Sequence, residues 1–351
     1  MIDNLLPIVD MLDKFLGSTT TDFFKNVHFI NQVMFVNNEY SYLILNNKLW
    51  KNSDKYSIDL LDLQNGLKIF NKNDVVNIVD NTELKISSNN GYIVLEKQPL
   101  QTTIPDLSDK PELCMEILLS DLIDLFNTNS NIGSPGDDTF TNVAFNNNGK
   151  LILGTSTNHS FLVSYSDLLN DKCSVNTSFK YAFMRHFVKT CELINIKDAT
   201  VKIFVNNKYI IFDINDDIKI FYLKHQEDNF NNFKQLANYI VEAQGNLITQ
   251  LDLQSLKDKI KKLYTATNKS YFGNFIELSD KIYFGYKKNT IETKLNLDIN
   301  TNRNIHKFAN FISMYKFLNT LTSSKIDLVE YFINDDTYIS FENNNNKFVV
   351  I

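Results

Sequence analysis

Hydrophobic positions in the last third of the chain follow a helical pattern first and an alternating pattern afterwards. Leu253, Leu256, Ile260 and Leu263 recur every three or four residues, which predicts an amphipathic helix over 251–266. A second helix is predicted over 304–321. Short runs typical of strands lie between and after these helices, at 275–278, 281–287, 290–299, 325–333, 337–343 and 347–351. The pattern therefore predicts a helix followed by three strands, repeated once.

The middle and first thirds of the chain show the same order. The middle third begins with a strand that runs into a helix at 115–127 and has a second helix at 179–193, while the first third has helices at 3–16 and 61–71. Breaks occur near 98–112, where three prolines cluster, and near 224–247. We therefore predict an α+β protein of three similar domains (1–105, 106–227 and 228–351), each with two helices packed on antiparallel sheets.

Composition limits the possible classes of protein. Of the 351 residues 43% are hydrophobic, which is enough to build a core and excludes global disorder. The formal net charge of −6 argues against a generally basic coat for nucleic acid, although a local basic face on an acidic body is compatible with it.

The three cysteines are Cys114, Cys173 and Cys191, and no two of them form a CxxC pair. This spacing argues against a disulfide scaffold and against a structural zinc site. The sequence therefore predicts a reduced protein with buried thiols. No run of 18 apolar residues predicts a membrane span, and the N-terminal segment lacks the basic start of a signal peptide. We expect a cytoplasmic protein, bacterial or encoded by a phage, because Asn, Lys, Ile, Phe and Tyr are frequent.

No pattern of catalytic residues stands out. The five histidines are isolated, and no nucleophile motif, phosphate-binding loop or dinucleotide fingerprint occurs. The segment 133–138 (GSPGDD) carries two carboxylates but lacks the ligand spacing of a calcium loop. We therefore expect a binding protein without catalytic residues, cofactor or metal.

Basic residues gather on the polar faces of the predicted helices. Such cations can contact phosphates without reading base sequence. By contrast, the helices at 3–16 and 119–127 carry more acidic than basic residues. The candidate DNA-binding residues are Lys180, Arg185, Lys189, Lys257, Lys259, Lys261, Lys262, Arg303 and Lys307.

From 179 onward the chain resembles the DNA sliding clamps, specifically the three-domain bacterial β-clamp type. The resemblance is carried by 251–299, by NIHKFANFISMYKFLNTL at 304–321 and by the terminal KFVVI. It implies three repeated clamp domains in a ring that encircles duplex DNA and slides along it. Such rings are head-to-tail homodimers that tether a DNA polymerase and are opened by a clamp loader.

The resemblance also implies a pocket for partner peptides near the C-terminus. Phe230 and Phe233 match the aromatic pair of the family's connector between domains, with Asn231 where a proline is typical. The candidate pocket residues are Phe230, Phe233, Phe348, Val349, Val350 and Ile351.

Three alternatives remain open at this point. The chain is compatible with a clamp-fold transcription or replication cofactor that does not encircle DNA. It is also compatible with a β-rich virion protein, or with a hydrolase whose site lies near 133–138.

Overall fold

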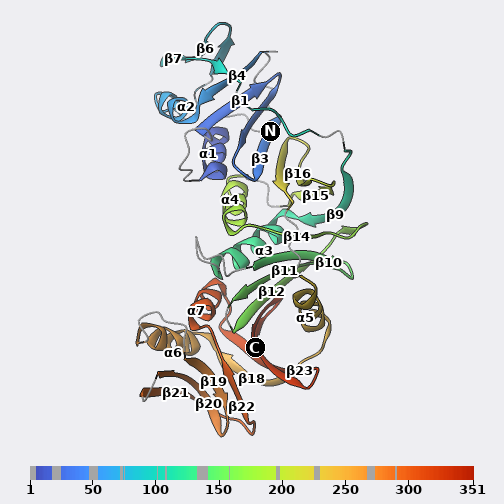
Figure 1. Cartoon of the computed structure of the whole chain (residues 1–351). Helices are drawn as coiled ribbons and strands as arrows, with labels where there is room; N and C mark the ends of the chain where they lie inside the picture. Colours follow the sequence, from blue (N-terminus) through green and yellow to red (C-terminus); the bar gives the residue numbers. More distant parts are fainter. Residues whose placement is uncertain are drawn as a thin grey trace. The chain divides into compact units, whose positions relative to one another are not determined.

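The computed structural model describes residues 5–17, 25–46, 54–71, 74, 76–100, 102–106, 109–132, 141–157, 159–194, 198–224, 230–266, 273–288 and 291–351. Its helices and strands are shown in Figure 1. The helices are α1 (Leu5–Leu16), α2 (Leu60–Leu67), α3 (Leu119–Ile132), α4 (Tyr181–Cys191), α5 (Phe230–Glu242), α6 (Leu253–Ala266) and α7 (Phe311–Thr320). None of the helices in these ranges is long and apolar enough to cross a membrane.

The strands of the first 132 residues are β1 (Asn26–Ile30), β2 (Val33–Asn37), β3 (Ser41–Asn46), β4 (Lys55–Asp59), β5 (Asn77–Asp80), β6 (Leu84–Ser88), β7 (Gly91–Leu95), β8 (Gln98–Pro99) and β9 (Glu112–Leu118). Those that follow α3 are β10 (Thr141–Asn147), β11 (Lys150–Thr157), β12 (Ser160–Asp167), β13 (Asn170–Asp171), β14 (Asn176–Ser178), β15 (Thr200–Val205), β16 (Tyr209–Ile214) and β17 (Ile218–Leu223). The last group is β18 (Asn246–Asp252), β19 (Asn274–Leu278), β20 (Lys281–Lys288), β21 (Ile291–Asn300), β22 (Ile305–Phe308), β23 (Lys325–Ile333), β24 (Asp336–Asn343) and β25 (Asn346–Val350).

The chain forms two compact units. Unit 1 comprises 1–123, 168–173 and 185–224, and unit 2 comprises 124–167, 174–184 and 225–351. The predicted middle domain, 106–227, is thus shared between the two units. The prediction of three domains remains an expectation from the repeat pattern.

Unit 1 contains a ten-stranded antiparallel sheet in the order β13-β9-β15-β16-β17-β3-β2-β1-β4-β8, and a separate sheet β5-β6-β7. The long sheet joins strands of the first and middle thirds of the chain where β17 pairs with β3, from Ile218↔Leu45 to Tyr222↔Ser41. A small apolar cluster, which includes Ile44 and Phe221, lies at this joint. Leu100 and Ile104, from the extended connector between the first and middle thirds, pack against the cluster.

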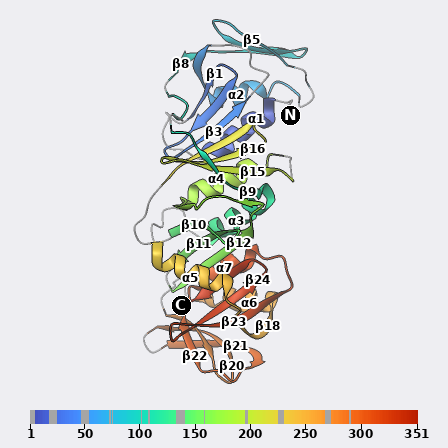
Figure 2. The same ribbon diagram turned by 90° about the vertical axis from the view of Figure 1, so that its right-hand side faces the viewer.

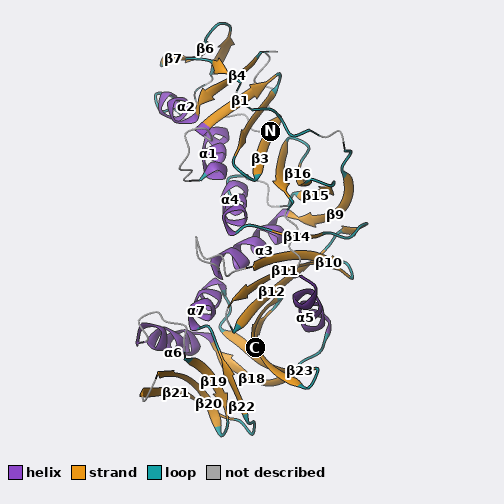
Figure 3. Cartoon of the chain, viewed as in Figure 1, coloured by secondary structure: helices purple, strands orange, loops and turns teal. Residues whose placement is uncertain are grey.

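Unit 2 contains an eight-stranded sheet in the order β14-β10-β11-β12-β25-β24-β23-β18, and a four-stranded sheet β21-β20-β19-β22. Its joint is formed by β12 and β25, from Ser160↔Val350 to Ser164↔Asn346. Helices α6 and α7 lie side by side, as Figure 3 shows, and their buried residues share a large core with both sheets. The periodic apolar positions that predicted the helix at 251–266 point into this core.

Helix α5 covers the other face of the eight-stranded sheet, across β11 and β12 in Figure 2. Its buried side chains Ala237, Ile240 and Val241 follow helical spacing and pack with residues of β10, β11, β12, β23 and β25. Gly154 of β11 permits the close approach of Phe233, because a Cβ atom at this position would overlap the ring.

Two element predictions for the last third need correction. The helix predicted over 304–321 begins only at Phe311, because Asn310 caps it by accepting a hydrogen bond from the Ser313 N–H at 3.1 Å. Residues 305–308 instead form β22, which pairs with β19. Ile305 and Phe308 are three residues apart, which is a helical spacing, but in β22 they lie on opposite faces of the strand. The second correction is that the break near 224–247 contains α5.

The prediction that all cysteines are free thiols is wrong for two of the three. Cys114 and Cys173 form a disulfide, whereas Cys191 is free and buried. The two bonded residues lie 59 positions apart, and they meet because β13 pairs with β9. Their spacing in the sequence carries no signal for such a long-range pairing.

Candidate nucleic-acid interface

Helix α6 presents a basic face. The helix begins after Asp252, whose carboxylate accepts a hydrogen bond from the Ser255 N–H at 2.7 Å, and it buries one apolar stripe. Lys261 and Lys262 are exposed opposite that stripe, and Lys259 is half-buried. The ammonium of Lys257 points elsewhere, because its Nζ donates to the carbonyl oxygen of Leu321 at 3.4 Å. The structure thus supports three of the four predicted lysines as a solvent-facing group.

Helix α4 presents a second basic face. Arg185 and Lys189 are exposed one turn apart, opposite the buried Phe183 and Phe187. Burial lowers the pKa of the neighbouring His186, and the positive charges of Lys189 and Arg185 lower it further. Lys180 is exposed directly before the helix. Arg185 and Lys189 belong to unit 1, whereas Lys180 belongs to unit 2.

Arg303 and Lys307 do not lie on a helix, contrary to the prediction. Arg303 lies before β22, and its guanidinium lies 3.3 Å from the carboxylate of Glu330. Lys307 lies within β22, with its ammonium 5.5 Å from the ring centroid of Tyr338. Both cations therefore have partners within unit 2 and do not extend the basic face of α6.

The acidic helices agree with the sequence pattern. Asp10 and Lys14 of α1 are exposed, and so is Asp124 of α3. Positive charge on the helices is therefore uneven, and it is concentrated on α4 and α6.

The predicted pocket residues do not share one surface. Val349 is buried against the face that α5 covers, and Phe233 packs edge-to-face on Phe161 with ring centroids 5.6 Å apart. Phe348 and Val350 point to the opposite side of β25, into the large core of unit 2, because side chains alternate along a strand. Ile351 is 45% exposed, and its N–H donates to the carbonyl oxygen of His159 at 3.2 Å. The side chain of Phe230 lies outside the described part of the chain.

A buried lysine that the sequence analysis did not single out joins α5 to the sheet. Lys347 of β25 donates from Nζ to the carbonyl oxygen of Ile240 at 2.9 Å and to the hydroxyl of Tyr331 at 2.7 Å. That hydroxyl donates to Glu342, whose carboxylate also lies 3.4 Å from the ammonium. Alternation in KFVVI, which places Lys347 and Val349 on one face, was the available signal.

Among the residues that the structure describes, no three His, Cys, Asp or Glu side chains are grouped to hold a metal ion. The loop 133–138 lies outside those residues. The candidate binding features of the described residues are therefore two basic helix faces and an apolar sheet face covered by α5.

Comparisons with known proteins give a clear result for the fold. No protein-family model and no curated protein sequence matches the chain. Among solved structures it is similar to a putative DNA polymerase III beta subunit from Eubacterium rectale, with a TM-score of 0.76, 13% identity and coverage of 99% of this chain and 96% of that one. It is also similar to a sliding clamp, the DNA polymerase III beta subunit of Pseudomonas aeruginosa bound to griselimycin, with a TM-score of 0.75, 13% identity and coverage of 99% and 96%.

A third similar structure is the DNA polymerase III beta subunit of Thermotoga maritima, with a TM-score of 0.73, 10% identity and coverage of 99% and 96%. The chain therefore has the sliding-clamp fold along its whole length, as the resemblance in its last half implies. At these identities the likeness establishes the fold.

Proposed function

We propose that this protein is a DNA sliding clamp, a processivity factor that encircles duplex DNA and tethers a polymerase without catalysing a reaction itself. The observation that carries the proposal is the match of nearly the whole chain to clamps that are themselves matched over nearly their whole length.

The pairing of the sheets supports a ring closed by a second copy. At each joint, a strand that ends a series of three consecutive antiparallel strands pairs with the end strand of another such series. These pairs are β17 with β3 and β25 with β12. The strands in the equivalent positions of the remaining sheets are β7 and β21. Each lies at the edge of its sheet, with no neighbour on its outer side among the described strands. Pairing of β7 with β21 of a second copy would make a head-to-tail homodimer, whose closure gives a ring.

The basic faces of α4 and α6 support contact with the DNA backbone. Arg185, Lys189, Lys259, Lys261 and Lys262 can neutralise phosphates without reading bases, which allows a ring to slide. The acidic residues of α1 and α3 imply that DNA contacts are stronger at α4 and α6 than elsewhere. We assign Lys180 a supporting role at the start of α4.

Partner contacts remain a proposal based on the resemblance. A polymerase and a clamp loader are expected to bind in the bacterial cytoplasm, near the exposed Ile351 and the outer side of α5. Phe233 and Val349 would support that surface from beneath, because both pack in the cluster under α5.

The first experiment measures mass in solution across a dilution series by light scattering after size exclusion. A ring of two copies gives twice the chain mass of 40.7 kDa. Val94 is the residue to change. Hydrogen-bonded and non-hydrogen-bonded residue pairs alternate along the β6–β7 hairpin, and Val94 belongs to a non-hydrogen-bonded pair. Its N–H therefore points away from β6, toward the outer edge of the sheet. Val94→Pro removes this donor and should yield monomers, whereas Val94→Thr keeps it and should remain dimeric. A monomer at every concentration in the unmodified protein would contradict the ring.

The second experiment tests encirclement. Dilute protein is assembled on a nicked circular plasmid, which is then linearised. A clamp should stay with the circle in high salt and leave the linear DNA, whereas equal retention on both would indicate an ordinary DNA-binding protein. Replacing Lys261 and Lys262 by Gln should lower the salt dependence of duplex binding by about 0.9 per lost phosphate contact. Lys257→Gln is the matched control, because its ammonium is directed at Leu321.

A further inference from the structure

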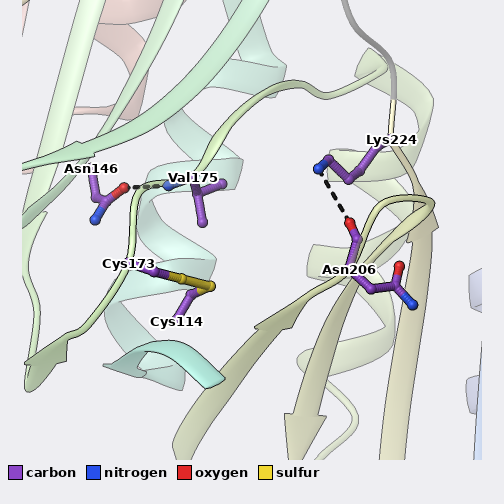
Figure 4. The surroundings of a disulfide bond; sticks show 6 residues. All are labelled: Cys114, Asn146, Cys173, Val175, Asn206 and Lys224. Atoms are coloured by element: carbon purple, nitrogen blue, oxygen red, sulfur yellow. Dashed lines mark hydrogen bonds between the residues drawn. A yellow bond between two sulfur atoms is a disulfide. The ribbon is translucent and has the colours of Figure 1, made fainter. Parts of the chain in front are cut away.

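The disulfide holds a short strap, residues 168–173, on the edge of the ten-stranded sheet (Figure 4). Only two residue pairs of the strap are in register with β9, Asn170↔Glu116 and Asp171↔Met115. Further backbone bonds run from the Leu169 N–H to the Glu116 carbonyl at 2.8 Å and from the Lys172 N–H to the Cys114 carbonyl at 2.7 Å. Leu169, Asp171 and Lys172 are exposed, so the strap adds little buried apolar surface to the edge.

The strap is a brief return of the chain to unit 1. The chain enters unit 2 at Asp124, comes back for 168–173 and leaves again at Ser174. Two residues after Cys173, the Val175 N–H donates to the Asn146 side chain of β10 at 2.6 Å, within unit 2 (Figure 4). The chain passes from unit 1 to unit 2 after Cys173. It is therefore held in unit 1 by the disulfide and in unit 2 by this hydrogen bond.

The two bonded cysteines differ in exposure. Cys114 is 2% exposed within β9, whereas Cys173 is half-buried and flanked by the exposed Lys172 and Ser174. The third cysteine, Cys191, is buried, and burial followed by the negative charge of Glu192 raises the pKa of its thiol. Because thiolates carry out exchange and need access, Cys173 is the position open to external thiols and Cys191 is closed to them.

We propose that the Cys114–Cys173 bond is a redox-sensitive clasp in which Cys173 exchanges with small-molecule thiols, and that its reduction releases the strap 168–173 from β9. The thiolate of a small thiol attacks Sγ of Cys173, the bond to Cys114 breaks, and Cys114 leaves as a thiolate that takes up a proton. A second small thiolate then attacks the mixed disulfide, which frees Cys173 and yields the oxidised small disulfide. Two electrons pass from the small thiols to the protein, and the reverse sequence restores the clasp.

The proposal does not depend on DNA binding by the protein. In a reducing compartment a disulfide is more often a redox sensor than a permanent scaffold, which favours a clasp that opens. Among the described strands, opening leaves β9 paired to β15 alone, and it frees the strap's backbone donors. The expected consequence is a local rise in hydrogen exchange without global unfolding.

The test uses the full chain purified without reductant, then treated with reduced glutathione and alkylated under native conditions before mass spectrometry. Cys173 should carry the glutathione adduct first, Cys114 should be alkylated after it, and Cys191 should stay unlabelled. Hydrogen exchange within 168–173 should rise about tenfold on reduction while that of β10 and β11 stays unchanged. An adduct first on Cys114, two free thiols before any reductant, or unchanged exchange in the strap would each overturn the proposal.

A pair of variants separates the clasp from general destabilisation. Cys173→Ser should show the fast exchange of 168–173 without reductant and no further change with it. Cys191→Ser should behave as the unmodified protein in both states. If Cys173→Ser does not fold, the reduced and reoxidised states of the unmodified protein give the same comparison, and failure of reoxidation to restore slow exchange would count against the clasp.

Discussion

The two compact units share one construction and stabilise it differently. Each carries a long antiparallel sheet in which two groups of strands meet through a ladder of five residue pairs. In unit 1 the joint is covered by two side chains of an extended, proline-rich connector, Leu100 and Ile104. In unit 2 a whole helix, α5, covers the joint and is tied to it by the buried Lys347.

The comparison shows that backbone pairing between two strands forms the joint in both units, whereas the residues that cover the apolar face of the joint differ. Backbone pairing needs no particular side chains, so both joints form the same register pattern from unrelated sequences. The apolar face left by pairing must still be buried, and a helix with three buried side chains buries more of it than two residues of a connector. The stability of unit 2 should therefore depend on its cover more than that of unit 1.

The largest expected effect comes from the helix cover. Ile240→Ala removes a fully buried side chain from under α5 and should lower the free energy of unfolding of unit 2 by about 2–4 kcal/mol, measured by urea denaturation followed by circular dichroism. Ile104→Ala is the matched change at the other joint, where the side chain is half-buried, and should cost less than about 1.5 kcal/mol. Equal losses at the two joints would show that the covers are equivalent.

A second difference concerns acid. Burial lowers the pKa of His28 in β1 to about 4, an effect partly offset by the side-chain oxygen of Asn37, which favours the protonated ring. The unfolded chain takes up a proton at this residue near pH 6.5, whereas the folded chain does so only near pH 4. Stability from this residue is therefore complete above pH 6.5 and is lost as the pH falls toward 4.

Between pH 7 and pH 5 the loss from His28 alone should be about 2 kcal/mol in unit 1. The measurement is the difference in unfolding free energy between pH 7 and pH 5. This difference should be smaller in His28→Gln than in the unmodified protein by the contribution of His28. A pH dependence in His28→Gln that matches the unmodified protein would contradict the assignment.

The smallest effect in this series comes from the tie between α5 and its sheet. Lys347→Met keeps the length of the side chain but leaves the Ile240 carbonyl and the Glu342 carboxylate without the ammonium, which should cost about 1–2 kcal/mol. Hydrogen exchange should accelerate in the last turn of α5 before it does so in β25. Lys325→Met, at an exposed position of β23, serves as the control and should change neither quantity.

Much of the fold was predictable where the pattern was local. The helices α1, α2, α3, α4 and α6 and most strands agree with the periodicity of apolar residues. The stretch 304–310 was assigned to a helix because Ile305 and Phe308 continue the helical spacing of Ile312 and Tyr315, whereas pairing with β19 makes 305–308 a strand. Helix α5 lies where the resemblance implies a connector between domains, although Phe233, Ala237 and Ile240 have helical spacing.

The candidate site was predictable in part, for a related reason. The exposed cations of α4 and α6 follow from the apolar faces opposite them. The partners of Lys257, Arg303 and Lys307 come from segments distant in sequence, so no local pattern reveals them.

The sequence by itself determined the repeated order of helices and strands, the side of each helix that faces the core, and the uneven distribution of positive charge among the helices. These properties depend on residues within one or two turns of each other. The tertiary structure decided the disulfide, the cover over each joint, the identity of the two cores that Phe348 and Val349 enter, and the strand edges that have no partner among the described strands. These depend on which distant segments pair in the sheets, and that choice reflects the burial of apolar faces and backbone hydrogen bonds summed over the whole chain.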